Sequence, residues 1–152
     1  MSFVNHYLIK LVVYRTLIEK FYWRDVVILV KISILKTKIT YIISNVNKAL
    51  AYEWISAYLN KDKFEINFIL LNPGDSELES FLKENAIPVE RVTYAGKTDL
   101  LSALLKTYRL LKKNRSAIIH THLFDASLIG LTAGRMAGVK KEFTPGITPI
   151  TI

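Results

Sequence analysis

The sequence predicts an α/β fold in which helices flank a parallel β-sheet. Between residues 38 and 143, short apolar runs rich in β-branched residues alternate with segments whose apolar residues have helical spacing. The connections between these segments are short. Alternation of this kind implies right-handed crossovers, which place helices on both faces of a parallel sheet. A chain of 152 residues has room for one domain of ordinary size.

The first predicted strand covers residues 38–44, and Asn45 to Asn47 can form the turn and cap that follow it. A helix over 49–59 is inferred from apolar residues at helical spacing, namely Leu50, Trp54, Ile55, Tyr58 and Leu59. The second strand, 64–71, ends in the turn sequence 72–75, Asn-Pro-Gly-Asp. Ser76 and Glu79 then have the spacing of a capping box, which opens a short helix that buries Leu78, Phe81 and Leu82.

The third strand covers 87–93, with Pro88 at its start, where a missing N–H group costs little. Thr98 or Asp99 is expected to cap the next helix. Its predicted buried residues are Leu101, Leu104, Leu105, Tyr108 and Leu111. A strand over 117–121, a helix over 125–136 and the start of a fifth strand at 140–143 complete the pattern. We therefore expect a Rossmann-like sheet over residues 38–143.

Residues 1–37 are predicted to be a separate apolar and basic extension. They contain no Gly or Pro, and their charges do not gather on one helical face. A strand at 26–30 and a helix at 8–21 are possible. The extension could be a packed addition, a membrane-surface anchor or sequence translated from an upstream start. Its charged residues argue against a transmembrane helix, and a secretory signal also fits poorly.

The net charge of +8 favours an anionic partner such as a membrane surface, a nucleotide or a nucleic acid, although an ordinary basic domain is equally compatible. Lys106, Arg109, Lys112, Lys113 and Arg115 form a basic cluster near the end of the third predicted helix. A solvated helix end is one interpretation, and contact with anionic lipid headgroups is the other. Because no recognised nucleic-acid-binding module accompanies the cluster, nucleic acid is not expected as a partner. Cysteine is absent, so no disulfide or thiolate metal site exists.

The segment Ala117 to Ala126 is the most informative part of the chain for function. An apolar strand leads into His120, His122 and Asp125, and a helix rich in Gly and Ala follows. Ligands of open parallel sheets bind beyond the carboxyl ends of the strands, so these side chains are candidate binding residues. The small residues of that helix indicate close packing against a neighbour, and Asp125 is expected to cap its N-terminus.

Several chemistries are open to His120 and His122. An H-x-H pair occurs in metal-dependent hydrolases, but this sequence supplies no complete ligand set, so no metal is expected. No G-x-S-x-G sequence is present for a nucleophile. The two side chains could instead bind a sugar hydroxyl or a phosphate oxygen. Alternatively, His120 ends a buried strand as a packing residue, and His122, predicted to lie beyond the strand, is the better candidate.

The turn after the first strand, residues 44–48, contains no glycine. It therefore lacks the G-x-G-x-x-G pattern of dinucleotide-binding folds, and no cofactor is expected. The amides of Asn45 and Asn47 suit a ligand rich in hydroxyl groups, although both residues could equally be a turn residue and a helix cap.

From residue 38 to about 141 the chain resembles the N-terminal half of family-four retaining glycosyltransferases. The resemblance rests on six segments taken in order: 39–44, 68–75, 87–89, 95–100, 120–126 and 133–139. It implies one of two facing Rossmann-like domains (the GT-B type), and sugar transfer from a nucleotide sugar to a glycan or lipid-linked acceptor. Asn45, Asn47 and His122 match positions that line the acceptor side of the cleft. The first loop departs from the family in lacking its usual glycine pair.

The resemblance also implies an enzyme that is cytoplasmic, either free or peripheral to the membrane, and whose donor site lies in a second domain. Such a hexosyltransferase would be inactive without that domain, so activity of this chain alone is not expected. Residues 144–152 fit no continuation of the fold. With the codons shifted by one nucleotide, they can read Thr-Arg-His-His-Ser-Asp-Tyr-His, so we expect an aberrant tail from a truncated or frameshifted gene. The alternative is a small Rossmann-like binding module that docks on a protein or membrane through its first 36 residues.

Overall fold

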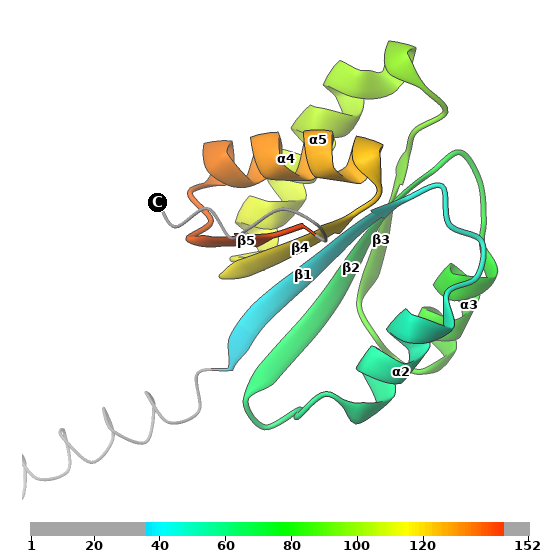
Figure 1. The fold of residues 1–152 in the computed structure, drawn as a ribbon, viewed down its shortest axis with the longest axis vertical. Coiled ribbons are helices and arrows are strands. Elements are labelled where there is room, and N and C mark those ends of the chain that lie inside the picture. The colour runs from blue at the N-terminus through cyan, green and yellow to red at the C-terminus, as the bar shows by residue number, and fades with distance from the viewer. Residues whose placement is uncertain (1–35, 145–152) are drawn as a thin grey trace, which may run out of the picture. The chain divides into compact units, whose positions relative to one another are not determined.

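The computed structural model describes residues 36–144, and it confirms the predicted α/β fold. The sheet has five parallel strands: β1 (Thr37–Ser44), β2 (Phe64–Asn72), β3 (Val89–Thr93), β4 (Ile118–His122) and β5 (Lys141–Phe143). The spatial order is β3-β2-β1-β4-β5, so the chain reverses its direction of travel across the sheet between β1 and β4 (Figure 1). The strand and helix suggested at 26–30 and 8–21, and most of the 1–37 extension, lie outside the described residues.

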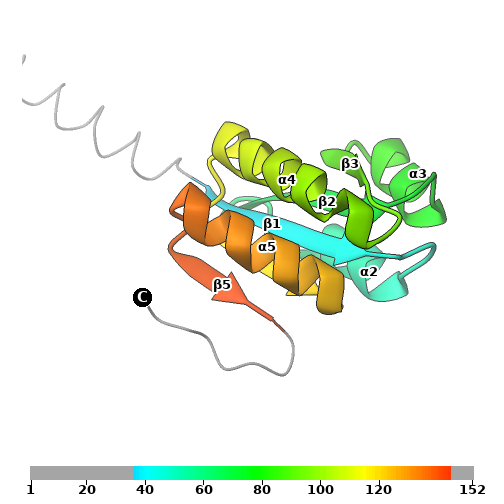
Figure 2. The same ribbon diagram turned by 90° about the horizontal axis from the view of Figure 1, so that it is seen from above.

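Two pairs of helices cover the sheet. Helices α2 (Leu50–Tyr58) and α3 (Glu77–Glu84) lie on one face, and α4 (Leu100–Asn114) and α5 (Phe124–Ala137) lie side by side on the other (Figures 1 and 2). A short 3₁₀ turn, η1 (Lys97–Asp99), precedes α4. All four helices begin at the carboxyl edge of the sheet, because each follows a strand in a right-handed crossover.

The sheet separates two apolar clusters. Ile42, Ile69 and Ile119 point toward α4 and α5, whereas Tyr41, Ile43 and Phe68 point toward α2 and α3. This division follows from the two-residue period of a strand. The central strands β1 and β2 are buried on both faces, which explains why their sequences are almost continuously apolar.

The structure corrects the predicted faces of two helices. On α2 the buried residues are Tyr52 and Ser56, whereas Leu50, Trp54 and Tyr58 are 53%, 64% and 86% exposed. On α4 the exposed fractions of Leu101 and Leu105 are 67% and 40%, and Ala103, Thr107 and Leu111 form the buried stripe. In both helices small or polar residues fill the narrow space above the sheet. Leu111 is buried, and Leu104, Tyr108 and Ile55 pack partly buried against the core as predicted, so apolar periodicity misplaced only the exposed residues.

The capping box is half confirmed. The backbone N–H of Glu79 donates to Ser76 Oγ at 3.2 Å, as expected of an N-cap. The Glu79 side chain does not return to the cap residue. Its carboxylate is 6% exposed, accepts a hydrogen bond from Lys83 at 2.6 Å and lies 3.5 Å from Arg91. Glu79 therefore links α3 to β3 through buried charge.

Helix α5 packs directly on β1 and β4 because two glycines face the sheet. A Cβ atom at Gly130 would lie 2.6 Å from Thr121 Cγ2 and 2.9 Å from Ile42 Cδ1, and one at Gly134 would lie 2.4 Å from Ile119 Cδ1. The predicted role of this small-residue stripe in close packing is thus confirmed. Gly138 differs from these two, because it ends the helix at φ +75°, in the left-handed region.

Replacing Gly130 with alanine is expected to destabilise the fold. Alanine favours a helix over glycine by about 1 kcal/mol, but overpacking of a rigid core costs about 1–3 kcal/mol. Thr121 is fully buried and β-branched, so it cannot move aside easily. We expect Gly130→Ala to lower the midpoint of thermal unfolding, measured by circular dichroism. Thr132→Ala, at an exposed position of the same helix, should leave the midpoint unchanged or raise it. An equal response of both variants would contradict this account.

The carboxyl group of Glu142, in β5, is buried beneath α5 and has few polar contacts that offset its loss of water. Its side chain is 4% exposed, and the nearest cation is Arg135, with Nε 3.7 Å from Oε2. Neither carboxylate oxygen has a hydrogen-bond partner among the described residues. Burial raises the pKa of Glu142, and the neighbouring Arg135 opposes this only in part. The folded chain therefore favours the protonated carboxyl group more than the unfolded chain does.

A raised folded-state pKa means that Glu142 contributes stability below its unfolded pKa and that this contribution is lost as the pH rises through the folded value. Glu142→Gln removes the charge and keeps the shape. We expect this variant to unfold at a higher temperature than the wild type at pH 7, with the difference shrinking toward pH 4. Thermal unfolding across that pH range measures both. A variant that is less stable at pH 7 would show that the ion pair with Arg135 outweighs the cost of burial.

Candidate functional site

The candidate site lies at the carboxyl edge of the sheet, between β1 and β4. The register of these strands pairs Tyr41 with His120 and Ile43 with His122, so Ser44 and the loop after it lie beside the end of β4. The strand order reverses here, and such a point is where open α/β sheets bind ligands. His122 is the last residue of β4 rather than a loop residue, which corrects the predicted end of that strand.

Asn45 occupies an exposed position at the start of the β1–α2 loop. Its φ of +50° lies in the left-handed region, which Asn tolerates better than most residues. Asn72, the last residue of β2, supports this loop and is 4% exposed. Asn72 Oδ1 accepts from the Val46 N–H at 3.1 Å, and its Nδ2 donates to the Val46 carbonyl at 2.6 Å. Asn72 thus fixes the path of the backbone beside Asn45.

Sequence reasoning missed the role of Asn72, because it assigned this residue only to a turn. Nothing in the local pattern distinguishes a turn asparagine from one that supports a loop 26 residues away. The position next to a strand end was the one available signal.

His122 is half-buried and lies edge-on to the ring of Tyr52, with ring centroids 5.9 Å apart. Tyr52 comes from α2, so this contact joins the helix after β1 to the end of β4. Burial, with a smaller contribution from Tyr41, raises the pKa of Tyr52 to about 12, so its hydroxyl group remains protonated at neutral pH. The partly exposed His122 ring can donate and accept hydrogen bonds toward the carboxyl edge.

His120 lies two residues earlier on the same face of the sheet. Its ring centroid is 5.1 Å from that of Tyr41, and it lines a hollow of about 360 Å³ with Ile39, Ile118 and Phe143. Burial, and to a lesser extent His122, lowers the pKa of His120, which favours the neutral imidazole. The apolar surroundings fit the packing interpretation of His120.

The remaining predicted residues lie apart from Asn45 and His122. The Asn47 amide is engaged by the first residue of α3: its Nδ2 donates to Glu77 Oε1 at 3.1 Å, and its Oδ1 accepts from the Glu77 N–H at 3.2 Å. Asp125 lies in the first turn of α5 and is not its cap, since the N-cap is Leu123 at φ +75°. The structure therefore places Asn45 and His122 at neighbouring strand ends, and it directs the Asn47 amide to Glu77.

One amide in the first turn of α5 has a partner on β1. Ser44 Oγ accepts a hydrogen bond from the Ala126 N–H at 3.3 Å, across the point of strand reversal. Asp125, in the same turn of α5, affects Tyr94. Burial raises the pKa of Tyr94, and the charge of Asp125 and a hydrogen bond to Asp125 raise it further. Within residues 36–144 no group of three His, Asp or Glu side chains could hold a metal ion.

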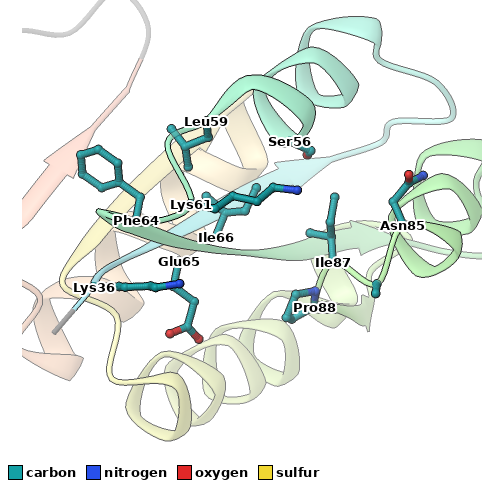
Figure 3. A pocket seen from close by; sticks show the side chains of 11 residues that line it. Lys36, Ser56, Leu59, Lys61, Phe64, Glu65, Ile66, Asn85, Ile87 and Pro88 are labelled. Atoms are coloured by element: carbon teal, nitrogen blue, oxygen red, sulfur yellow. The ribbon is translucent and has the colours of Figure 1, made fainter. Parts of the chain in front are cut away.

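A separate hollow of about 210 Å³ lies at the opposite, amino edge of the sheet. Figure 3 shows its apolar floor, including Ile66 and Ile87, and the long side chain of Lys61 beside it. It lies at the other end of β2 from Asn72 and so is not part of the site between β1 and β4.

Comparison with known proteins agrees with the resemblance inferred from the sequence, although no protein-family model matches the chain. One curated relative is the Escherichia coli UDP-Gal:alpha-D-GlcNAc-diphosphoundecaprenol alpha-1,3-galactosyltransferase. It is 29% identical over 112 residues, which cover 72% of this chain and 28% of the relative. Among solved structures, Acinetobacter baumannii MurG matches with a TM-score of 0.56 and 13% identity. That match covers 71% of this chain and 33% of MurG.

These matches cover about a third or less of each longer protein. The MurG match bears on the fold alone, because its sequence identity is low. The galactosyltransferase match adds a similarity of sequence across most of the described domain.

The support given by Asn72 can be tested directly. Asn72→Ala removes the partners of the partly buried Val46 N–H and carbonyl, and the loss of such a hydrogen bond typically costs about 1 kcal/mol. We expect faster hydrogen exchange at the Val46 amide and a lower unfolding midpoint. Asn72→Asp, which retains an acceptor for the Val46 N–H, should protect that amide more than Asn72→Ala does. Unchanged exchange in both variants would show that the loop holds its path without Asn72.

The strand order and the MurG match agree on a Rossmann-like α/β fold, and the galactosyltransferase match shows that the chain is similar in sequence to part of a glycosyltransferase.

Proposed function

We propose that this domain is the acceptor-side half of a glycosyltransferase, and that Asn45 and His122 bind hydroxyl groups of the acceptor sugar. The observation that carries the proposal is the placement of these two polar side chains on neighbouring strand ends at the reversal point. The curated relative transfers galactose from UDP-Gal to a GlcNAc-diphosphoundecaprenol acceptor, as its name states. A diphosphate-linked amino sugar on a lipid is therefore the acceptor class we propose.

The chemistry of the two residues suits this task. An asparagine amide offers two donors and an acceptor, and an imidazole can donate or accept, so together they can match vicinal hydroxyl groups. The exposed position of Asn45 gives access from solvent, while Asn72 and Tyr52 restrict the movement of the loop and of the His122 ring. Asn47 and Asp125 would shape the margins of the site through Glu77 and Tyr94.

Sugar transfer by a GT-B enzyme needs a second wall that holds the nucleotide sugar. The matched region spans only 28% of the galactosyltransferase. The wall that holds the nucleotide sugar would therefore correspond to a part of that relative which this domain does not match. We accordingly propose that the 152-residue chain binds an acceptor headgroup but does not transfer sugar alone.

Acceptor binding can be measured with the isotopically labelled full chain and a soluble GlcNAc diphosphate. We expect NMR shift changes at the amides of Asn45 and His122 and weaker changes with UDP-galactose. Asn45→Ala and His122→Ala should each raise the dissociation constant about 3–10-fold, because a lost hydrogen bond costs about 0.5–1.5 kcal/mol. Asn85→Ala, an exposed asparagine at the amino edge, is the matched control and should bind normally.

Three outcomes would count against the proposal. Shift changes confined to other parts of the domain would move the site, and an absence of binding would favour a docking module without a sugar site. Galactosyl transfer from UDP-galactose by the chain alone would refute its inactivity.

A further inference from the structure

Helix α2 exposes an apolar face that carries no charged side chain. The opposite side of the helix buries Tyr52 against Tyr41 and Phe68 of the sheet (Figure 1). The exposed fractions of Trp54 and Tyr58 are 64% and 86%. The exposed residues lie three or four positions apart, so they share one side of a single helix. We call this side the α2 face, and its residues are Leu50, Ala51, Trp54, Ala57 and Tyr58.

The α2 face has an apolar centre and a polar rim, as protein interfaces do. Exposed polar residues border it at both ends: Asn47 and Lys48 precede the helix, and Asn60 and Lys61 follow it. Within α2 the single charged residue is Glu53, which is half-buried. Trp and Tyr are enriched among the residues that contribute most to binding energy, whereas lysine is depleted from interface centres. The α2 face is therefore suited to a protein partner.

Side-chain size on the α2 face is symmetric about Trp54. The small residues Ala51 and Ala57 lie three positions before and after it, and the large residues Leu50 and Tyr58 lie four positions before and after it. In an antiparallel pair of identical helices with a two-fold axis at Trp54, equal distances on either side of that residue face each other. Tyr58 of one copy would meet Leu50 of the other, and the alanines would leave room for the rings. An interface between identical copies requires this kind of self-complementarity.

We propose that two copies of the chain associate through their α2 faces, with Trp54 on the two-fold axis. The symmetry of side-chain size favours a second copy, because an unlike protein or a lipid surface does not require it. The net charge of +8 makes two copies repel, but the face itself is uncharged, and repulsion is screened beyond about 10 Å at 0.1 M salt.

The expected dimer is weak. Aromatic side chains bury about 150–250 Å² each when fully enclosed. With Leu50 and the alanines, the partly exposed rings of Trp54 and Tyr58 supply about half of the roughly 800 Å² that each partner buries in a standard interface. Association should therefore depend on concentration in the micromolar range, and higher salt should strengthen it by screening the repulsion.

Sedimentation equilibrium of the full chain tests the proposal. We expect the mass to rise from 17.4 kDa toward twice that value as the concentration increases. Trp54→Glu should weaken self-association about 30-fold or more, the loss typical of a central aromatic residue. The matched control is Phe124→Glu, at a residue of α5 that is 80% exposed, and it should associate like the wild type. Unfolding midpoints near that of the wild type establish that both variants fold.

A charge pair tests the position of the axis. On the axis, residue 54 of one copy meets residue 54 of the other. Trp54→Glu and Trp54→Lys should therefore each self-associate poorly, because like charges meet, whereas an equal mixture of the two variants should associate more tightly than either alone.

Cross-linking tests the direction of the helices. The chain has no cysteine, so single cysteines report one position each. In an antiparallel pair, a short bis-maleimide should join Leu50→Cys to Tyr58→Cys in a mixture. Either variant alone should be joined much less efficiently.

Several results would overturn the proposal: a mass that stays at 17.4 kDa at every concentration, equal losses for Trp54→Glu and Phe124→Glu, or no gain on mixing the two charge variants. Leu50→Cys joined to itself more efficiently than to Tyr58→Cys would exclude the antiparallel arrangement. Trp54-dependent partitioning into phosphatidylcholine vesicles in place of self-association would assign the face to lipid. These assays contain neither sugar nor nucleotide, so their failure leaves the acceptor proposal intact, and the reverse also holds.

Discussion

The close approach of α5 to β1 and β4 is the constraint on which the rest of the domain depends. Two glycines allow the helix backbone to lie directly on Thr121, Ile42 and Ile119, where a methyl group has no room. This contact fixes the strand ends at the point where the sheet order reverses. It also brings the Ala126 N–H to Ser44 Oγ, which joins the first amides of α5 to the end of β1. The positions of Asn45 and His122 follow from that junction.

The order of the elements could be predicted because strand and helix periods differ and the connecting turns have recognisable residues. Strand ends were accurate to within two residues, and the packing role of Gly130 and Gly134 was readable from their spacing. The inward faces of α2 and α4 were readable only in part, since Ile55, Leu104 and Leu111 were predicted correctly. Apolar spacing assumes that large side chains point inward, but the space above this sheet accepts Ser56 and Thr107 and leaves Trp54 and Leu101 in solvent. The distance between a helix and the sheet depends on tertiary packing, which the local sequence pattern does not encode.

The candidate site, like the helix faces, could be predicted from the sequence only in part. Residue types and strand-end positions selected Asn45 and His122 as candidates, because the carboxyl ends of parallel strands meet at one edge. The same reasoning included Asn47 and Asp125, whose side chains turn to Glu77 and to Tyr94. It overlooked Asn72, which acts across 26 residues of sequence. Which side chains at the strand ends contact one another depends on the paths of the loops. A residue in the left-handed conformation, such as Asn45, changes the direction of a loop without leaving a periodic pattern in the sequence.

The direction of the crossovers explains where several exposed apolar residues of the helices lie. Right-handed βα units start every helix at the carboxyl edge, so exposed residues in first and second turns collect around the candidate site. Leu50, Leu101 and Phe124 all lie in such first turns. Folding alone would favour polar residues there, since these side chains gain nothing from the core. These side chains therefore border the carboxyl edge of the sheet, where the acceptor proposed above would bind.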